Sequence, residues 1–513
     1  MAVSGKSDFF QTSGLGGSSV ANLGPVSTSD ISTNANTGDL RRRYNFGDRV
    51  SELSIAQDPF FRFVSKVAKK PTDDPRFKFT EKRSSFHKRY AYVGAAKDNS
   101  GSWVTTSDLG ASSVSAVGAD MYVRMITDYK NDGLQQNVYG NTANEIKIGA
   151  SGTMPKFFLP DQLVKIPCAA SAGGAVSDYL VGKVVSVTEY SGNGSHNDAT
   201  STSSNNSDMV ELRLTVVKAG TQYLSTTADI DDASSVTPAD DSIHSALEPM
   251  RSYVVGTAHG EGTGYPETWK DQPYSQSYGI TQIFKTSAAM TNTARATVLK
   301  YEPNEWARVW KEKLVEHKWD IEASLLFGSQ SETYGTTQGA VDYILNYGNQ
   351  FSLDTATKTA DDFLDDMSNF LDPRYNNGAA TMFFVSTAVY NWMHKLGGYF
   401  KINLEISSNF RADFAMTGKK KVMGVDITTF STPYGDMNVA RNIHLDGTNV
   451  KMLGINMKYC AYRPLVGNGV NRDTSVYVGV QTLENSGIDR RVDLILTEAG
   501  MEWCCPETHA VWK

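Results

Sequence analysis

Residues that could carry chemistry are sparse in this chain, and the most concentrated group is a set of carboxylates. The set comprises Asp361, Asp362, Asp365 and Asp366. In a helix these side chains would occupy little more than one turn, where they could hold a cation or exchange protons in general acid–base catalysis. The alternative is an acidic helix start stabilised by the helix dipole and by solvent, and we favour it.

Other short stretches are similar to known ligand-binding or catalytic motifs, but each lacks residues that its motif requires. Gly5-Lys6-Ser7 is like the end of a phosphate loop, but no glycine stands five residues earlier and no strand precedes it. The glycine-rich stretch 260–264 lacks the GxGxxG spacing and a following helix, so a flexible turn is the better interpretation. Segment 128–133 is similar to a calcium loop, but Lys130 and Tyr139 replace required ligands. No GxSxG or HExxH sequence occurs.

The eight histidines and four cysteines show no metal-ligand spacing. Cys168 and Cys460 stand alone, while Cys504 and Cys505 are adjacent, so neither a disulfide scaffold nor a zinc site is expected. His317 falls inside a predicted helix, where a packing or surface role is a better interpretation than a role as a base. We therefore expect no enzyme activity, no cofactor and no metal ion.

Composition indicates a globular chain. Of its 513 residues, 40% are hydrophobic and 20% charged, and this length suggests two to four structural units. The formal net charge of −7 argues against a dedicated nucleic-acid binder. The first residues lack a signal-peptide pattern, and the apolar run 379–393 is too short to span a bilayer. A soluble, intracellular protein without membrane contact is expected.

Charge is unevenly distributed along the chain. Residues 41–97 hold fifteen basic and six acidic residues, whereas residues 98–513 carry a net charge of −14. Two interpretations stay open: neutralisation within the chain, or a basic arm that lies on the acidic body of a neighbouring copy. The cations assigned to such an inter-subunit arm are Arg41, Arg42, Arg43, Arg62, Lys66, Lys69, Lys70, Arg76, Lys78, Lys82 and Arg83.

The first 39 residues favour a segment that orders only against a partner. They contain 21 Ser, Thr, Gly or Asn residues, and Phe9-Phe10 is their only bulky apolar pair. So little apolar surface cannot offset the entropy of ordering the segment. Beyond it, aromatic residues alternate with basic ones at 77, 79 and 86, which also suits single-stranded nucleic acid, although the arm remains the preferred interpretation.

Hydrophobic periodicity predicts the main elements. We expect helices over 48–68 with a break at Asp58-Pro59, over 302–328, over 360–371 and over 379–396. Strands are expected at 163–166, 179–190 and 210–217, with a polar hairpin tip at 191–207, which gives a small β module over about 150–225. Further short strands follow between 422 and 496.

The helix 302–328 has a single apolar stripe that includes two tryptophans, which is typical of core or interface packing. Several other aromatic residues fall in loop-like or terminal positions, among them Trp503 and Trp512, where interface contacts and ordinary core edges explain them about equally well. The candidate interface or helix-packing residues are Trp269, Tyr274, Tyr278, Trp306, Trp310, Leu314, Ile321 and Leu325.

Three blocks resemble the major capsid proteins of tailed double-stranded DNA bacteriophages, in the myovirus and podovirus branch with the Hong Kong 97 capsid fold. They are Gly47–Arg83 (GDRVSELSIAQDPFFRFVSKVAKKPTDDPRFKFTEKR), Tyr274–Gly328 (beginning YSQSYGITQIFKTSAAMTNTARAT) and Phe430–Leu445 (FSTPYGDMNVARNIHL). The likeness is one of block order and local texture over about a third of the chain, and no single motif is diagnostic.

The resemblance implies an α+β fold of four parts. Residues 1–75 would form an N-terminal arm, and residues 76–285 an extended loop that carries the inserted β module. Residues 286–375 would form a peripheral domain with a spine helix at 302–328, and residues 376–513 an axial domain that returns to the peripheral domain. The covalent Lys–Asn crosslinks of one member of this fold are not carried over.

The implied function is a major capsid protein. Its copies would assemble in the host cytoplasm into hexamers and pentamers of an icosahedral virion shell, which encloses DNA without reading its sequence. Portal, scaffolding and decoration proteins are the further partners that this implies. The alternatives are another structural virion protein, such as a tail-sheath or tail-tube subunit, and a β-rich hydrolase that uses the Asp361–Asp366 cluster.

Overall fold

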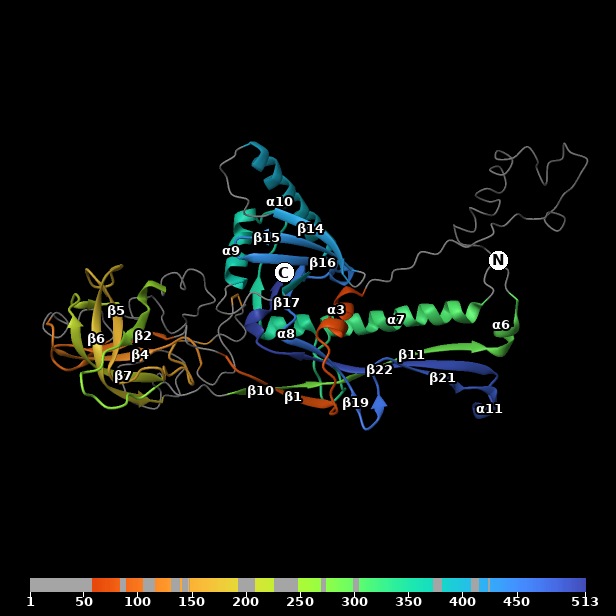
Figure 1. Cartoon of the computed structure of the whole chain (residues 1–513), viewed down its shortest axis with the longest axis horizontal. Helices are drawn as coiled ribbons and strands as arrows, with labels where there is room; N and C mark the ends of the chain where they lie inside the picture. Colours follow the sequence, from red (N-terminus) through yellow and green to blue (C-terminus); the bar gives the residue numbers. More distant parts are fainter. Residues whose placement is uncertain are drawn as a thin grey trace, which may run out of the picture. The chain divides into compact units, whose positions relative to one another are not determined.

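The computed structural model describes residues 58–83, 89–104, 116–130, 139–140, 146, 148–191, 208–225, 248–268, 274–298, 304–371, 381–406, 415–422 and 425–513, with only the backbone of 397–422. By its internal contacts the chain divides into two units, Met1–Ile55 with Thr297–Glu305, and Ala56–Ala296 with Trp306–Lys513. The first unit lies almost wholly outside the described residues. The elements below belong to the second unit (Figure 1).

Helix α3 (Pro59–Val67), which falls inside the arm predicted over 1–75, packs in the core. Pro59 occupies the first helical turn, where a missing N–H costs no hydrogen bond, and the helix therefore begins at this proline. Phe60 and Val64 have no exposed surface, and they pack in one cluster with residues of α7 (Glu305–Phe327). After the helix, Lys69 forms a bridge with Tyr462 in parallel orientation.

Two strands from distant parts of the sequence form a separate antiparallel pair. Strand β1 (Arg76–Glu81) pairs with β10 (Ser275–Ile280). Phe77 and Phe79 are both buried in β1, while Phe86 lies outside the described residues. Gly279 is required here, because a Cβ at this position would lie 2.4 Å from the Phe77 ring. This two-stranded stem therefore flanks the described residues between 81 and 275.

A closed β-barrel occupies the sequence between the two stem strands. Its pairings run from β2 to β4, β7, β6, β5 and β9, and β9 pairs again with β2, so the sheet closes on itself. Strands β3 and β8 extend it at β2 and β5. The strands are β2 (Tyr90–Lys97), β3 (Trp103–Val104), β4 (Asp120–Ile126), β5 (Gln162–Ala169), β6 (Val176–Tyr190), β7 (Met209–Lys218), β8 (Tyr223–Leu224) and β9 (Ser252–Thr257), and β9 follows the 3-10 helix η4 (Glu248–Met250).

The barrel extends beyond the β module predicted over about 150–225, because β2, β4 and β9 belong to the same sheet. Strand β7 matches its predicted alternation, with Val210, Leu212 and Leu214 buried inside the barrel. Strand β2 is buried at nearly every position and does not alternate, so its sequence could not be assigned to this sheet. Closure at β9 joins segments more than 150 residues apart, a pairing that periodicity does not encode.

The strongest predicted helix lies along a small antiparallel sheet (Figure 1). Helix α7 begins at Glu305 rather than at 302 and ends before Gly328, and it lies along β11 (Gln282–Thr291) and β22 (Arg490–Trp503). Strand β11 pairs with one edge of β22, and strands β18 (Cys460–Pro464) and β21 (Ser475–Gln481) pair with its other edge. Short elements around this sheet are α6 (Asn292–Ala296), β19 (Val466–Gly467), β20 (Val470–Asn471) and α11 (Leu483–Ser486).

A mixed seven-stranded sheet forms the rest of the unit. Its order is β12-β23-β17-β13-β16-β15-β14, with β12 parallel to β23 and β13 parallel to β16. The hairpin of β15 and β16 carries the block FSTPYGDMNV. The strands are β12 (Asn349–Phe351), β13 (Thr381–Val385), β14 (Ala415–Val422), β15 (Val425–Thr432), β16 (Gly435–Arg441), β17 (Met452–Asn456) and β23 (Ala510–Trp512), with 3-10 helices η5 (Ile443–Leu445) and η6 (Pro506–Thr508).

Helices cover both faces of this sheet, and alternate strand residues therefore enter different cores. Along β13, Phe384 joins the cluster that contains α3, α8 (Ala340–Tyr347) and the end of α7, whereas Phe383 joins the cluster with α9 (Ala360–Phe370) and α10 (Thr387–Ile406). The helix predicted over 379–396 is therefore wrong in its first part and correct from Thr387 onward. Residues 381–385 are a strand, because a fully buried central strand shows no alternation that separates it from a helix.

Candidate assembly surfaces

The long helix α7 is buried at its C-terminal end and half-exposed toward its N-terminal end. Ile321 and Leu325 have no exposed surface and lie in the core with α3. Trp306, Trp310 and Leu314 belong to the same predicted stripe but retain part of their surface. The stripe residues toward the N-terminal end of α7 are thus only partly covered by other described residues, and part of their surface is free for contacts with another molecule.

His317 connects α7 to both neighbouring strands. Its Nδ1 lies 2.9 Å from the hydroxyl of Thr286 in β11, and its Nε2 lies 2.8 Å from the hydroxyl of Thr497 in β22. The side chain is 1% exposed, and burial lowers its pKa. A neutral ring between two hydroxyl groups is a packing residue, in agreement with the interpretation from sequence.

Replacing His317 by glutamine is expected to lower the free energy of unfolding by roughly 1–3 kcal/mol at pH 8, because one or both hydroxyls lose their partner. As the pH falls through 6.5, the unfolded chain takes up a proton that the folded ring resists, so wild type loses stability while the variant loses less. Urea unfolding at pH 8 and pH 5 measures both effects. His259→Gln, on the barrel surface, is the control and should change stability by about 0.5 kcal/mol or less.

Two of the predicted interface aromatics lie at the exposed two-stranded stem. Tyr274 is 65% exposed and Tyr278 is 39% exposed. The Arg76 guanidinium lies 4.4 Å from the centre of the Tyr278 ring, and the Lys82 Nζ lies 5.2 Å from that of Tyr274. Trp269 lies outside the described residues. The aromatic rings of the stem therefore make cation–π contacts within the chain, and the exposed surface that they form is partly charged rather than purely apolar.

The two C-terminal tryptophans are core residues, so of the two interpretations left open by the sequence, core packing is the correct one. Trp503 is 2% exposed and Trp512 has no exposed surface. Trp503 donates a hydrogen bond to the carbonyl of Gln338, and Trp512 donates one to Asp366. Terminal position in the sequence was misleading, because β22 and β23 return the chain end to the centre of two sheets.

Most of the predicted arm cations that the structure describes are paired with acids of the same chain. Lys69 pairs with Asp473, and Lys70 lies 3.9 Å from Glu502. The remaining pairs are Arg62 with Asp58 and Arg76 with Glu332. For these residues neutralisation within the chain is the better of the two interpretations. Lys66 and Lys78 are exposed without an ion-pair partner among the described residues, and Arg41, Arg42 and Arg43 lie outside them.

Arg83 differs from the other arm cations because it is buried. Its side chain is 7% exposed, and its guanidinium lies 2.8 Å from Glu81 and 2.7 Å from Glu507. Burial raises the pKa of Glu81 although Arg83 opposes the shift. A buried cation shared by two carboxylates holds the end of β1 against the C-terminal segment, so a surface role for Arg83 is not supported.

An exposed apolar strand lies at the edge of the small sheet, and sequence reasoning did not identify it as a surface. Val476, Tyr477, Val478 and Val480 of β21 are each at least 41% exposed. Leu483 in the following helix is 53% exposed. Alternating valines that stay exposed among the described residues are typical of contact surfaces. The periodicity of this strand could be read from the sequence, but its exposure could not.

The carboxylates at the start of α9 serve the fold. Asp362 forms a capping box with Thr359, and backbone hydrogen bonding there lowers its pKa. Asp366 lies 2.5 Å from the Lys358 ammonium and accepts from Trp512, and burial raises its pKa. Within the described ranges no group of three or more His, Cys, Asp or Glu side chains could hold a metal ion. The favoured structural interpretation of this cluster agrees with its geometry.

No helix in the described part of the chain is long and apolar enough to cross a bilayer. A family model described as SU10 major capsid protein matches residues 27–513. A search of the curated proteins gives no match.

Solved structures similar to this chain include several phage proteins. Microbacterium phage Oxtober96 matches at 14% identity over 50% of this chain and 80% of that chain, with a TM-score of 0.34. The capsid of Myoviridae phage XM1 matches at 10% identity over 50% and 80%, with a TM-score of 0.32. The mature capsid of bacteriophage PhiM1 matches at 10% identity over 50% and 78%, with a TM-score of 0.32. These TM-scores are low, so the family to which this chain belongs is assigned from the family match over residues 27–513 instead.

Proposed function

Because this chain belongs to the SU10 major capsid protein family, its function is that of a major capsid protein that forms a phage head, and we propose that it does so as rings of six and five copies. It is a structural protein of the virion rather than an enzyme. The tail-sheath, tail-tube and hydrolase alternatives are therefore wrong. The α+β architecture expected for a capsid protein of the Hong Kong 97 type is confirmed by its helices, its antiparallel sheets and its one mixed sheet among the described residues.

We assign the parts of the fold to capsid domains as follows. Helix α7 with β11, β22, β18 and β21 is the peripheral domain, and the seven-stranded sheet is the axial domain. The stem of β1 and β10 is the base of the extended loop, and it carries the barrel. The arm shortens from 1–75 to about 1–55, because α3 is buried in the core. In the axial domain, the β15–β16 hairpin is the proposed contact around the ring.

The observation that carries the ring proposal is the exposed apolar surface of β21 with the half-exposed stripe of α7. A ring contact joins one patch to a different patch on the next copy, and a permanent shell buries roughly 2,000 Å² or more in each such contact. Electron microscopy of the purified protein tests the proposal. Closed shells or flat rings of six and five would support it, and helical tubes or a persistent monomer at high concentration would contradict it.

Assembly partners and place of assembly belong to the same proposal. The copies assemble in the host cytoplasm, with portal, scaffolding and decoration proteins as further partners. The shell encloses DNA without reading its sequence, since residues 98–513 carry a net charge of −14 and repel phosphate. Only the basic segment 41–97 has the charge to approach DNA, and several of its cations are already paired within the chain.

Deleting Met1–Ile55 is expected to leave a folded subunit that assembles poorly. The deletion ends before Asp58, so the buried α3 and its contacts with α7 are kept. A deletion to residue 97 would remove β1 and β2 as well and would unfold the protein, contrary to what the charge pattern alone suggests. Light scattering follows assembly, and circular dichroism checks folding.

The control for this deletion removes residues 1–40 and keeps Arg41, Arg42 and Arg43. If the three arginines carry the arm contact, the shorter deletion should assemble better than the longer one. Normal assembly of the protein that lacks Met1–Ile55 would show that these residues are not an assembly arm.

A further inference from the structure

The stem of β1 and β10 has one exposed, cationic face. Side chains alternate along a strand, so Arg76 and Lys78 lie on one face of β1, whereas Phe77 and Phe79 lie on the other face and are buried. Lys82 follows the same alternation just beyond the strand and is exposed. We call the exposed side of the stem, with these three cations, the stem face.

Strand β10 adds two tyrosines to the stem face. Tyr278 pairs in register with Lys78, and Tyr274 stands just before the strand. The Arg76 guanidinium lies 4.4 Å from the centre of the Tyr278 ring, and the Lys82 Nζ lies 5.2 Å from that of Tyr274. The rings therefore hold two of the three cations at the surface, which reduces the side-chain entropy that a bound partner would remove.

Carboxylates compensate only part of the positive charge of the stem face. Glu81 is the single acidic residue of β1 and β10, and it pairs with the buried Arg83. Glu332, from the loop after α7, pairs with Arg76. Lys78 has no ion-pair partner among the described residues. The stem face therefore keeps an excess of positive charge on a chain whose residues 98–513 carry a net charge of −14.

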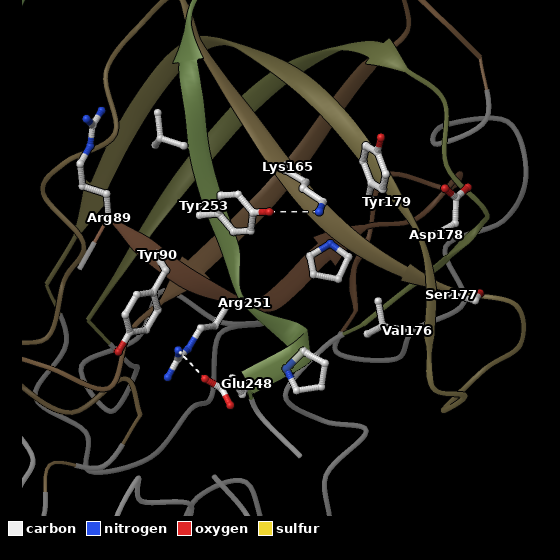
Figure 2. A pocket seen from close by; sticks show the side chains of 13 residues that line it. Arg89, Tyr90, Lys165, Val176, Ser177, Asp178, Tyr179, Glu248, Arg251 and Tyr253 are labelled. Atoms are coloured by element: carbon white, nitrogen blue, oxygen red, sulfur yellow. Dashed lines mark hydrogen bonds and ion pairs between the residues drawn. The ribbon is translucent and has the colours of Figure 1, made fainter. Parts of the chain in front are cut away.

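The cavity on the barrel differs from the stem face in its charge (Figure 2). It has a volume of about 730 Å³ and also brings cations beside tyrosine rings. Its carboxylates balance these cations, because Asp178 lies 2.9 Å from the Lys218 ammonium and Glu248 lies 3.3 Å from the Arg251 guanidinium. An anionic partner would meet two carboxylates at the cavity, so the stem face is the better site for a polyanion.

Charge density favours DNA over an acidic surface of a second copy as this polyanion. Duplex DNA carries one negative charge per roughly 1.7 Å of its axis, so a row of cations about 7 Å apart along a strand meets phosphates in any register. The carboxylates of this chain are less available. Glu332, Asp473 and Glu502 already pair with cations of the basic segment 41–97.

The aromatic residues indicate which part of the DNA is contacted. Phe77 and Phe79, whose spacing among basic residues also suits single-stranded nucleic acid, are buried on the opposite face. Tyr274 and Tyr278 each have a cation against the ring. Bases stack on open rings, so the stem face favours contacts with phosphates over contacts with bases.

We propose that the stem face contacts the sugar–phosphate backbone of the enclosed DNA, with Lys78 and Lys82 donating to phosphate oxygens. This inference deepens the proposed function and rests on it, because it requires a shell that encloses DNA. Phosphates carry no sequence information, so the contact is independent of sequence. The stem face then lines the inside of the shell.

The first experiment titrates the isolated full-length subunit with two short fluorescent DNA duplexes of unrelated sequence at rising NaCl concentrations. Wild type should bind both duplexes equally. The variant Lys78→Gln with Lys82→Gln should bind about fivefold more weakly or worse, and the slope of log K against log salt should fall by roughly 1 for each lysine. Circular dichroism checks that the variant is folded.

The matched control is Lys311→Gln with Lys395→Gln, which removes the same charge at exposed positions of α7 and α10. It should keep the affinity and the salt slope of wild type. A loss that depends on position rather than on net charge would support the stem face as the DNA contact.

The second experiment needs no variant. Lys78 and Lys82 are acylated with an amine-reactive reagent in DNA-filled heads and in empty shells of the same chain, and mass spectrometry compares them with Lys311. Both stem lysines should react several-fold more slowly in filled heads than in empty shells, while Lys311 should react equally in the two.

Four results would overturn the proposal. They are equal DNA binding by the stem variant and the control variant, unequal binding of the two duplexes, full reactivity of Lys78 and Lys82 in filled heads, and equal protection of both lysines in empty shells, which would identify a second copy as the partner. Failure to form shells would instead contradict the proposed function, and the titration of isolated subunits remains readable in that case.

Discussion

Replacing Glu322 by alanine is expected to destabilise the subunit by about 3–5 kcal/mol. Glu322 is fully buried in α7 and accepts hydrogen bonds from the backbone N–H groups of Phe60 and Phe61, at 3.1 Å and 2.5 Å. It also accepts from Asn442 at 2.8 Å. The carboxylate thus holds the first turn of α3 on α7, and its removal leaves these donors buried without a partner.

The same group makes stability depend on pH. Burial raises the pKa of Glu322 to about 7 from its ordinary value of 4.5, although the three donors oppose the shift. Between these values the folded state holds a proton that the unfolded chain has released. The part of the stability that comes from this bound proton is therefore fully present below pH 4.5 and is lost as the pH rises to about 7. The loss is on the order of 3 kcal/mol, at 1.36 kcal/mol for each pKa unit.

Glu322→Gln tests this dependence, because glutamine keeps the volume and one acceptor but cannot ionise. The stability of the variant minus that of wild type should be larger at pH 8 than at pH 5, because only the wild-type side chain ionises over this range. Urea unfolding followed by tryptophan fluorescence measures the difference. Glu316→Ala on the exposed face of the same helix is the control and should cost about 0.5 kcal/mol or less at both pH values. An alanine variant as stable as this control would show that Glu322 does not fasten α3.

The second large effect is expected for Arg83→Met, at about 3–5 kcal/mol of lost stability. Methionine keeps much of the volume but leaves Glu81 and Glu507 buried together without their cation. Chemical unfolding of isolated subunits measures the loss, and assembly should fail only because the subunit unfolds.

Lys78→Met is the matched control, since it removes one cation from the same part of the chain at an exposed position. It should leave stability unchanged within about 0.5 kcal/mol. If Arg83→Met kept full stability and lost assembly alone, Arg83 would act between subunits, as the charge pattern first suggested. Comparing the two variants therefore separates a cation of the fold from a cation of the surface.

Local patterns in the sequence were sufficient where a segment has one buried face. The stripe of α7 and the alternation of β7 each have such a face, and both elements lie where periodicity placed them. The acidic start of α9 was assigned from sequence to the helix dipole and solvent, and the structure adds a capping box between the neighbouring residues Thr359 and Asp362. Composition and missing motifs also excluded catalysis correctly, since the family is structural.

Only the tertiary structure decided which charges and which apolar residues remain on the surface. Arg83 and Lys78 are both cations of the basic segment, yet one is buried between two carboxylates 424 and 2 residues away and the other is exposed. Strand β13 has no periodicity because both its faces are covered, and β9 closes the barrel against a strand more than 150 residues distant. The physical reason is that burial depends on contacts between remote segments, whereas sequence patterns report only on neighbours along the chain.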